Sequence, residues 1–289
     1  MVNFIRFDSY KLLHMNATWI TLLILSLIFS LLTYGGYVTT HKSYEDYQLS
    51  MASKESNEEG NFKLEIKSMQ EGEILTEEEY ETSIQEEKKA YRFSDSLIAN
   101  YSLSLLFVYI LSAVFIESDF SSGYLKNMLA IKGAKWKWVT SKLFVALLIF
   151  FIFQVVCIAF SVLMAGVTGQ IEFPIHWQDH LALLLPQALM YLIIMSVTVT
   201  LSLLLQSKVA IIVLACLMGA GFHNQIIGFI GDIVGLDLTK QLFSIKLMSM
   251  GPNYAEQAMS VVSMGVIYLL VLYLLNRWYI YRIDFKFEH

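Results

Sequence analysis

Few side chains in this sequence could do chemistry, and those that could gather in two places. His176 and His180 have the i, i+4 spacing that would put two imidazoles on one face of a helix, where they could share a zinc ion. No third or fourth ligand is evident beside them. Trp177 lies between them at the edge of an apolar segment, so polar residues in an interfacial aromatic belt are the simpler interpretation.

The second polar group is His223, Asn224 and Gln225, late in another apolar segment. Two interpretations stay open for it. The side chains could line a substrate path or stabilise a broken helix, or they could mark the outer end of a helix. Cys157 and Cys216 lie inside apolar segments, and we interpret both as small hydrophobic residues.

The sequence also lacks the short motifs of common enzyme sites. It contains no G-x-x-x-x-G-K-[ST] phosphate-binding loop, no H-E-x-x-H zinc motif and no G-x-S-x-G nucleophile motif. Nothing in it resembles a nucleophile with a base to activate it. We therefore expect no catalytic residue, no metal and no cofactor in this chain, and no nucleic-acid partner.

The elements that carry these residues are those of a membrane protein. Of the 289 residues, 56% are hydrophobic and 16% are charged, against about 25% charged in a typical soluble domain. A membrane-spanning helix needs about 20 mostly apolar residues. Six segments qualify, which predicts an all-α membrane protein with six transmembrane helices: 17–38, 97–116, 143–167, 181–205, 209–230 and 258–279.

Two features of these segments bear on mechanism. The far end of the fifth segment holds a run of glycines that begins at Gly219 and continues to Gly235, which favours a break or a re-entrant turn over a plain helix. The central parts of all six segments hold no acidic or basic residue, whereas carriers driven by protons or sodium usually place such residues at mid-membrane depth. We therefore expect the energy for any transport to come from elsewhere.

Lys and Arg in the short connections predict the orientation. With the N-terminus in the cytoplasm, segments 1–16, 117–142 and 280–289 together with Lys208 and Arg277 carry eleven Lys and Arg on the inner side. Both termini are then cytoplasmic. The long connection 39–96 lies outside and has 15 acidic and 7 basic residues. We predict a solvated, partly helical loop there, with a helix that begins near Glu77 because Thr76 and Glu79 have capping-box spacing.

The connection 117–142 has a regular spacing of apolar residues that a simple linker would not need. Four apolar residues, Phe120, Tyr124, Met128 and Ile131, recur at helical spacing and predict one apolar face on a helix over 117–132. Gly133 would end that helix, and 134–138 would be an aromatic anchor that leads into the third span. Such a helix lies on a membrane surface or enters a groove of a partner.

These residues resemble a known family. The stretch FIESDFSSGYLKNMLAIKGAKWKWVTSKLF is similar to the connection between spans two and three of six-span export permeases of the ATP-binding cassette (ABC-2) type, which include bacterial bacitracin and lantibiotic exporters. Glu117 or Asp119, Gly123, Lys126 with Asn127, and Lys142 match its pattern. The opening NFIRFDSYKLLHMNATWI resembles the family's start, with Phe4, Asp8 and Lys11 in the matching places.

The resemblance implies a fold and a function. It implies an N-terminal amphipathic elbow helix over 1–16, a cytoplasmic coupling helix between spans two and three, and re-entrant helices over 231–257. It implies a permease in the bacterial plasma membrane that pairs with a second permease chain, the same or related, and with a cytoplasmic ATP-binding cassette ATPase that holds ATP and Mg. The residues expected to contact that ATPase are Glu117, Asp119, Phe120, Gly123, Tyr124, Lys126, Met128 and Ile131.

The expected cargo is a hydrophobic or amphipathic molecule, such as an antimicrobial peptide or a lipid-like compound, because the spans offer apolar and aromatic side chains. Membrane lipid is the remaining expected partner. Two alternatives belong to other classes. One is a membrane sensor or scaffold that works through the acidic loop 39–96. The other is an intramembrane metalloenzyme that uses His176, His180 or His223.

Overall fold

The computed structural model describes residues 1–40, 76–82, 93–129, 131, 133–168, 177–235, 237–250 and 254–282. Over these ranges the chain is helical and has no strand. The labelled elements are α1 (Val2–His14), α2 (Asn16–Thr40), α5 (Phe93–Ser121), α6 (Tyr124–Leu129), α7 (Ala134–Thr168), α8 (Trp177–Leu205), α9 (Lys208–Gly219), α10 (Phe222–Val234), η1 (Thr239–Gln241), α11 (Phe243–Met248) and α12 (Tyr254–Arg282).

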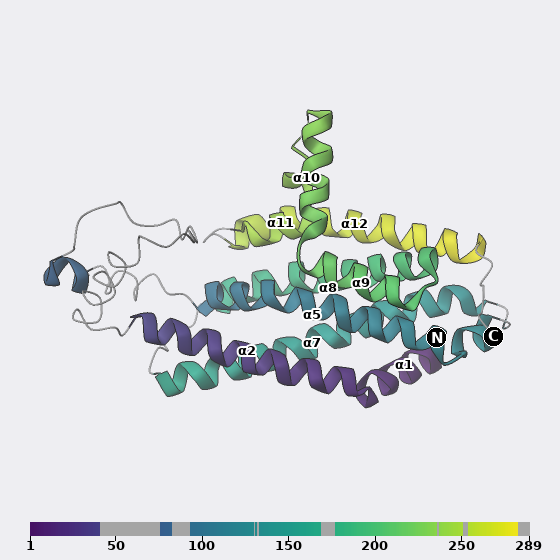
Figure 1. Cartoon of the computed structure of the whole chain (residues 1–289), viewed down its shortest axis with the longest axis horizontal. Helices are drawn as coiled ribbons and strands as arrows, with labels where there is room; N and C mark the ends of the chain where they lie inside the picture. Colours follow the sequence, from purple (N-terminus) through teal and green to yellow (C-terminus); the bar gives the residue numbers. More distant parts are fainter. Residues whose placement is uncertain are drawn as a thin grey trace, which may run out of the picture.

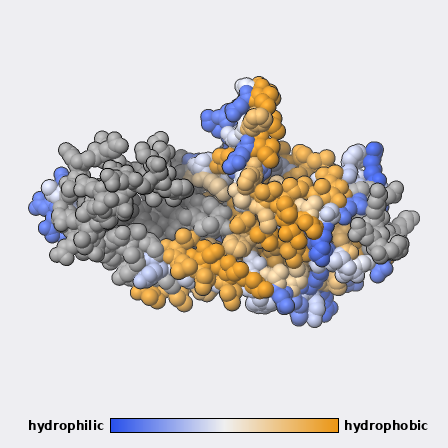
Figure 2. Space-filling view, viewed as in Figure 1, coloured by the Kyte–Doolittle hydropathy of each residue, from blue (hydrophilic) through white to orange (hydrophobic). Residues whose placement is uncertain are grey.

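The long helices identify a multi-pass membrane protein. Within the described ranges, α5, α7, α8 and α12 are each long and apolar enough to cross a membrane. Two further pairs qualify only when joined: α1 with α2, bent by 58°, and α9 with α10, bent by 74°. The described chain therefore has four to six spans, and the predicted six requires that each bent pair be one span. Figure 2 shows the apolar surface over the middle of the molecule, with polar residues toward the end that carries α1.

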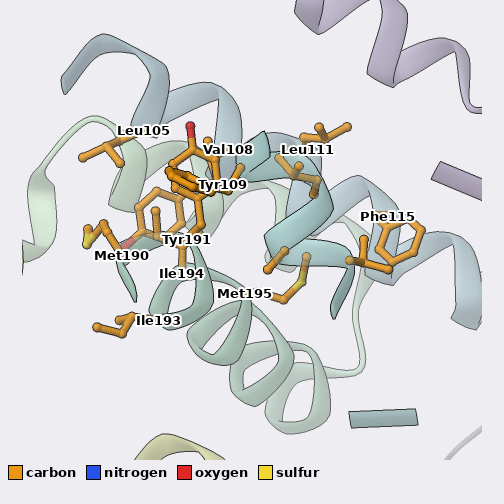
Figure 3. Close-up of a cluster of buried hydrophobic side chains, with 14 of the residues drawn as sticks. Leu105, Val108, Tyr109, Leu111, Phe115, Met190, Tyr191, Ile193, Ile194 and Met195 are labelled. Carbon is orange, nitrogen blue, oxygen red and sulfur yellow. The ribbon is translucent and has the colours of Figure 1, made fainter. Parts of the chain in front are cut away.

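The long helices run side by side along the long axis of the molecule, and α10 stands across it (Figure 1). The core lies between α5, α7 and α8, and Figure 3 shows the part that includes Tyr109 of α5 and Tyr191 of α8. In lipid, packing and interhelical hydrogen bonds hold helices together, because lipid tails are as apolar as the side chains. α12 contacts mainly α8 and lies at the edge of the bundle.

Hydrogen bonds join the helices inside this apolar bundle. The Gln154 amide of α7 donates to Gln187 Oε1 of α8 at 2.7 Å. The Asn276 amide of α12 donates to the Ser196 carbonyl at 2.9 Å, and its oxygen accepts from the Thr200 hydroxyl at 2.8 Å. Each such contact in a membrane is worth roughly 0.6–2 kcal/mol and fixes the rotation of one helix on another.

Helical structure is interrupted at two bends, one between α1 and α2 and one between α9 and α10. At Met15, between α1 and α2, the backbone is extended, and the last carbonyls of α1 are satisfied from α2: the Thr18 hydroxyl donates to Leu12 and the Trp19 indole to Leu13. At Gly221, between α9 and α10, φ is +84°, which favours glycine. The predicted fifth span, 209–230, is thus not one straight helix, and the break falls within the predicted glycine run.

The described part of the loop 39–96 includes a short helix over residues 77–82, at the opposite end of the molecule from α1 (Figure 1). The predicted helix start is confirmed, because the Thr76 amide and hydroxyl both donate to Glu79 Oε2, at 2.9 and 2.8 Å. These two bonds hold the pKa of the Glu79 carboxyl below its usual value. The predicted cytoplasmic segment 280–289 is described only to Arg282, where α12 ends; residues 283–289 lie outside the described residues.

Candidate functional site

Three helix ends meet at a buried charge cluster, which we define by Asp8 and Lys11 of α1, Asp119 of α5, and Trp138, Ser141 and Lys142 of α7. The Lys142 ammonium bridges the two acids: its Nζ lies 2.9 Å from Asp8 Oδ1 and 2.6 Å from Asp119 Oδ2. Lys11 pairs with the other oxygen of Asp119. Both carboxylates and Lys142 are fully buried.

Neutral donors complete the cluster. The Trp138 indole donates to Asp119 Oδ2 at 2.6 Å, and the Ser141 hydroxyl donates to Asp8 Oδ2 at 2.6 Å. The Lys142 ammonium also lies 4.5 Å from the centre of the Phe115 ring. Two carboxylates and two ammonium groups balance in charge, and the added hydrogen bonds offset part of the cost of taking them out of water.

The sequence places these groups by simple helical spacing. Asp8 and Lys11 are three residues apart on α1, and Trp138, Ser141 and Lys142 are three and four residues apart on α7, so each set shares a face. Asp119 lies in the last turn of α5. The cluster therefore joins the N-terminal helix, the end of one span and the start of another into one unit.

The cluster contains residues that carried the family resemblance. Asp8, Lys11, Asp119 and Lys142 come from two sequence stretches more than 100 residues apart and meet at one point. Asp119 was predicted to contact a partner, whereas it is buried and paired within the chain. One signal pointed to the pairing: acids and lysines at the inner ends of apolar segments need opposite charges nearby, because lone charges there are costly.

The predicted helix over 117–132 is wrong as a single element. Residues 117–121 belong to α5, and the chain turns at Gly123, where φ is +68°, before α6 starts at Tyr124. Left-handed backbone favours glycine, so this position breaks the helix. Gly133, with φ +75°, makes the second turn before α7. Most of the predicted anchor is the first turn of α7, where Trp138 is buried.

The predicted ATPase contacts fall into two groups. Some face inward: Glu117 is nearly buried and pairs with Lys208 at 3.1 Å, and Phe120 packs edge-on against Trp138 at 6.5 Å between ring centres. Tyr124 stacks on Phe7 of α1 at 4.7 Å. Ile131 is 60% exposed. The side chains of Lys126 and Met128 lie outside the described residues, and the docking role of the whole set stays a prediction.

α1 and α6 together form an open apolar groove of about 350 Å³ beside the charge cluster. The residues that line it are Asn3, Phe4, Phe7, Tyr124, Asn127 and Ile131. Tyr124 forms one wall, and its ring lies against α1 while α6 carries its backbone. Part of the apolar stripe predicted from the sequence therefore holds α6 against α1, and Ile131 and Asn127 remain exposed at the rim of the groove.

The pKa of Tyr124 depends on its burial and on the nearby carboxylates of the charge cluster. Burial first, and then the carboxylates of Asp8 and Asp119, raise the pKa of its phenol to about 12. Ionisation is thus easier in the unfolded chain, so alkaline pH weakens folding once it rises above about 10 and until it passes about 12. We expect the ultraviolet pH titration of the parent to contain a tyrosinate step near pH 12 that is absent from the titration of Tyr124→Phe. A step at the ordinary value near 10 would contradict this packing.

The second polar group predicted from the sequence, His223, Asn224 and Gln225, lies in the first turn of α10, directly after the break at Gly221. His223 Nδ1 lies 3.0 Å from the Met218 carbonyl, and Gln225 is exposed. The amide oxygen of Asn224 is buried without a hydrogen-bond partner in the described part of the chain. The substrate-path role of these three residues stays a prediction. His176 and the side chain of His180 lie outside the described residues, so the zinc site considered from the sequence is not tested.

Comparison with protein-family models found no match for this chain. Comparison with curated proteins found no significant match either. The function therefore has to be argued from the residues and their arrangement.

Proposed function

We propose that this chain is the permease subunit of an ATP-driven exporter of the ATP-binding cassette type, and that it moves a hydrophobic or amphipathic molecule out of a bacterial cell. The observation that carries the proposal is the charge cluster beside α6. A short helix between two spans transmits force only if it is fixed to those spans, and the cluster fixes α1, α5 and α7 to one another at that point.

The direction of coupling follows from this geometry. A cytoplasmic ATPase that closes on ATP would push on α6 and the rim residue Ile131. Because Tyr124 rests on α1 and Phe120 on α7, the push reaches three helices together rather than bending one loop. Coupling of this kind needs an element with two states, which here is the ATPase.

The sequence supplies the remaining support. It has no phosphate-binding loop, so the nucleotide belongs to a partner, and the central parts of its predicted spans carry no charge that could bind a driving ion. The positive-inside pattern puts α1, α6 and the end of α12 in or at the cytoplasm. In Figure 1, α1 and the last turns of α12 lie at the same end of the bundle, as this orientation requires.

The test is retention of the ATPase by a variant at the exposed rim. The tagged full-length chain, purified from its own membranes in mild detergent, is expected to bring an ATP-binding cassette ATPase that hydrolyses ATP. Ile131→Asp places a charge in an apolar contact and is expected to lower recovery of that ATPase about ten-fold, which corresponds to about 1.4 kcal/mol. Mass spectrometry and ATP turnover measure both.

The matched control is Ser121→Asp, which adds the same charge to an exposed residue of the same connection outside the groove. It is expected to retain the ATPase. The proposal fails if the parent chain carries no such ATPase, or if Ile131→Asp keeps it with normal turnover.

A further inference from the structure

Two cations lie close together where α7 begins and α12 ends. The Thr140 hydroxyl of α7 lies 3.3 Å from the Tyr273 hydroxyl of α12, so the two helices are neighbours at this level. The helices run in opposite directions, and the last turns of α12 lie at the end of the bundle that carries α1 (Figure 1). Lys137 comes three residues before Thr140, and Arg277 comes four residues after Tyr273. Both cations therefore lie roughly 4–6 Å nearer this end than the two hydroxyls.

Both cations lie on the side of this contact that faces lipid. Lys137, Phe144 and Phe151 recur at seven-residue intervals on one face of α7, and the two phenylalanines are 47% and 63% exposed. On α12, Arg277 follows Leu274 by three residues and shares its face, and Leu274 is 55% exposed. Other faces of both helices pack on α8. Because α8 covers the inner side of the contact, the two exposed faces meet on its outer side.

Neither cation has a carboxylate partner within the part of the chain that the structure describes. The acids near this end, Asp8, Asp119 and Glu117, are already paired with other lysines. Lys137 is half-buried, and Arg277 is exposed. Two like charges that face each other across a helix contact repel, and the apolar surroundings weaken the screening between them. An anion between the two side chains would turn this repulsion into attraction.

We propose that the headgroup of an anionic membrane phospholipid binds between Lys137 and Arg277, with its acyl chains along the exposed faces of α7 and α12. Packed helix axes are about 8–10 Å apart, so two long side chains can reach one phosphate from both sides. The guanidinium supplies a planar pair of donors to the phosphate, and the ammonium supplies a second charge. Basic sites between membrane helices bind anionic headgroups in this way.

The bound lipid would join α12 to α7. α12 lies at the edge of the bundle and contacts mainly α8, so a headgroup shared with α7 adds a second attachment at its last turns. The inference goes beyond the proposed function and does not depend on it, because neither ATP nor an ATPase takes part. Failure of the lipid experiment would leave the proposed function as it is.

Lipid binding to the delipidated full-length chain tests the proposal. Native mass spectrometry in a mild non-ionic detergent compares phosphatidylglycerol with phosphatidylcholine that has the same acyl chains. The parent is expected to bind phosphatidylglycerol more tightly. A Lys or Arg beside an anionic headgroup contributes about five-fold in affinity, so the double variant Lys137→Gln, Arg277→Gln is expected to lower this preference about 25-fold. Lys137→Arg keeps the charge and is expected to keep the preference.

The matched control is the double variant Lys135→Gln, Arg282→Gln, which removes the same charges from the ends of the same two helices. Lys135 is two residues from Lys137 and lies on another face of α7, and Arg282 lies 4.5 Å from the centre of the Trp278 ring. The control is expected to keep the preference. Equal loss in both double variants, or no preference in the parent, overturns the proposal. Displacement of phosphatidylglycerol by inorganic phosphate would also overturn it, because the site would then hold a free anion.

Discussion

Lys142→Met is expected to destabilise the folded chain by about 3–5 kcal/mol, the usual cost of removing one partner of a buried ion pair. Methionine keeps the length of the side chain but removes the ammonium that lies within 3 Å of both Asp8 and Asp119. The single remaining cation, Lys11, is bonded to Asp119, so Asp8 keeps only the Ser141 hydroxyl. The measurement is thermal unfolding of the purified chain in detergent.

The control is Lys240→Met, which makes the same chemical change at the Lys240–Asp237 pair, whose two side chains are 79% and 51% exposed. Exposed pairs contribute at most about 1 kcal/mol, so its unfolding midpoint is expected to stay close to that of the parent. Adding Asp8→Asn to Lys142→Met is expected to recover part of the loss, because it removes the carboxylate left without a cation. If Lys142→Met unfolds like Lys240→Met, the cluster does not hold the three helices together.

Gly219→Ala is expected to destabilise the chain by about 1–3 kcal/mol, although alanine is the better helix former. A Cβ at this position would lie 2.8 Å from the Cα of Leu106 and 2.8 Å from its Cδ1. The Cα belongs to the backbone of α5 and cannot rotate away, so α9 must move off α5. Close approach of this kind is what small residues permit in membrane helices.

The matched control is Gly166→Ala on α7, where a new Cβ would meet nothing within 4 Å. At Gly166 the expected effect is the higher helix propensity of alanine without a steric clash, so we expect between zero and about 1 kcal/mol of stabilisation. Unfolding in detergent should move in opposite directions for the two glycines. A shift of the same sign for both would mean that α9 and α5 do not touch at Gly219.

The coarse architecture could be predicted from the sequence, because an apolar run of about 20 residues by itself indicates a membrane-spanning helix. The helical class, the long helices around five of the six predicted segments and the helix start at Thr76 all follow from residue type and local spacing. The break in the fifth segment was also indicated by its glycines. Its 74° angle was not, because φ at Gly221 depends on what α9 packs against.

The candidate site was harder to predict, because its residues are close only in space. Asp119 was predicted as a polar contact to a partner because it lies in the stretch that resembles the coupling helix of the export permeases. Its partners Lys11 and Lys142 lie on other helices, and no local period links them. The predicted apolar stripe is not the face of one helix: Phe120 lies on α5, Tyr124 lies on α6 beyond the turn at Gly123, and both pack inward.

The distance in sequence between Asp8 and Lys142 has a consequence for biosynthesis. The two residues are 134 positions apart, so at about 5–20 residues per second the ribosome makes Lys142 roughly 7–27 s after Asp8. During that interval α1 carries an unpaired carboxylate and stays in the wet interface, while α2 is already made. The third long helix closes the cluster when it arrives. A nascent chain that stalls before residue 142 leaves Asp8 and Asp119 without their shared cation, and this unpaired state distinguishes an incomplete chain from a finished one.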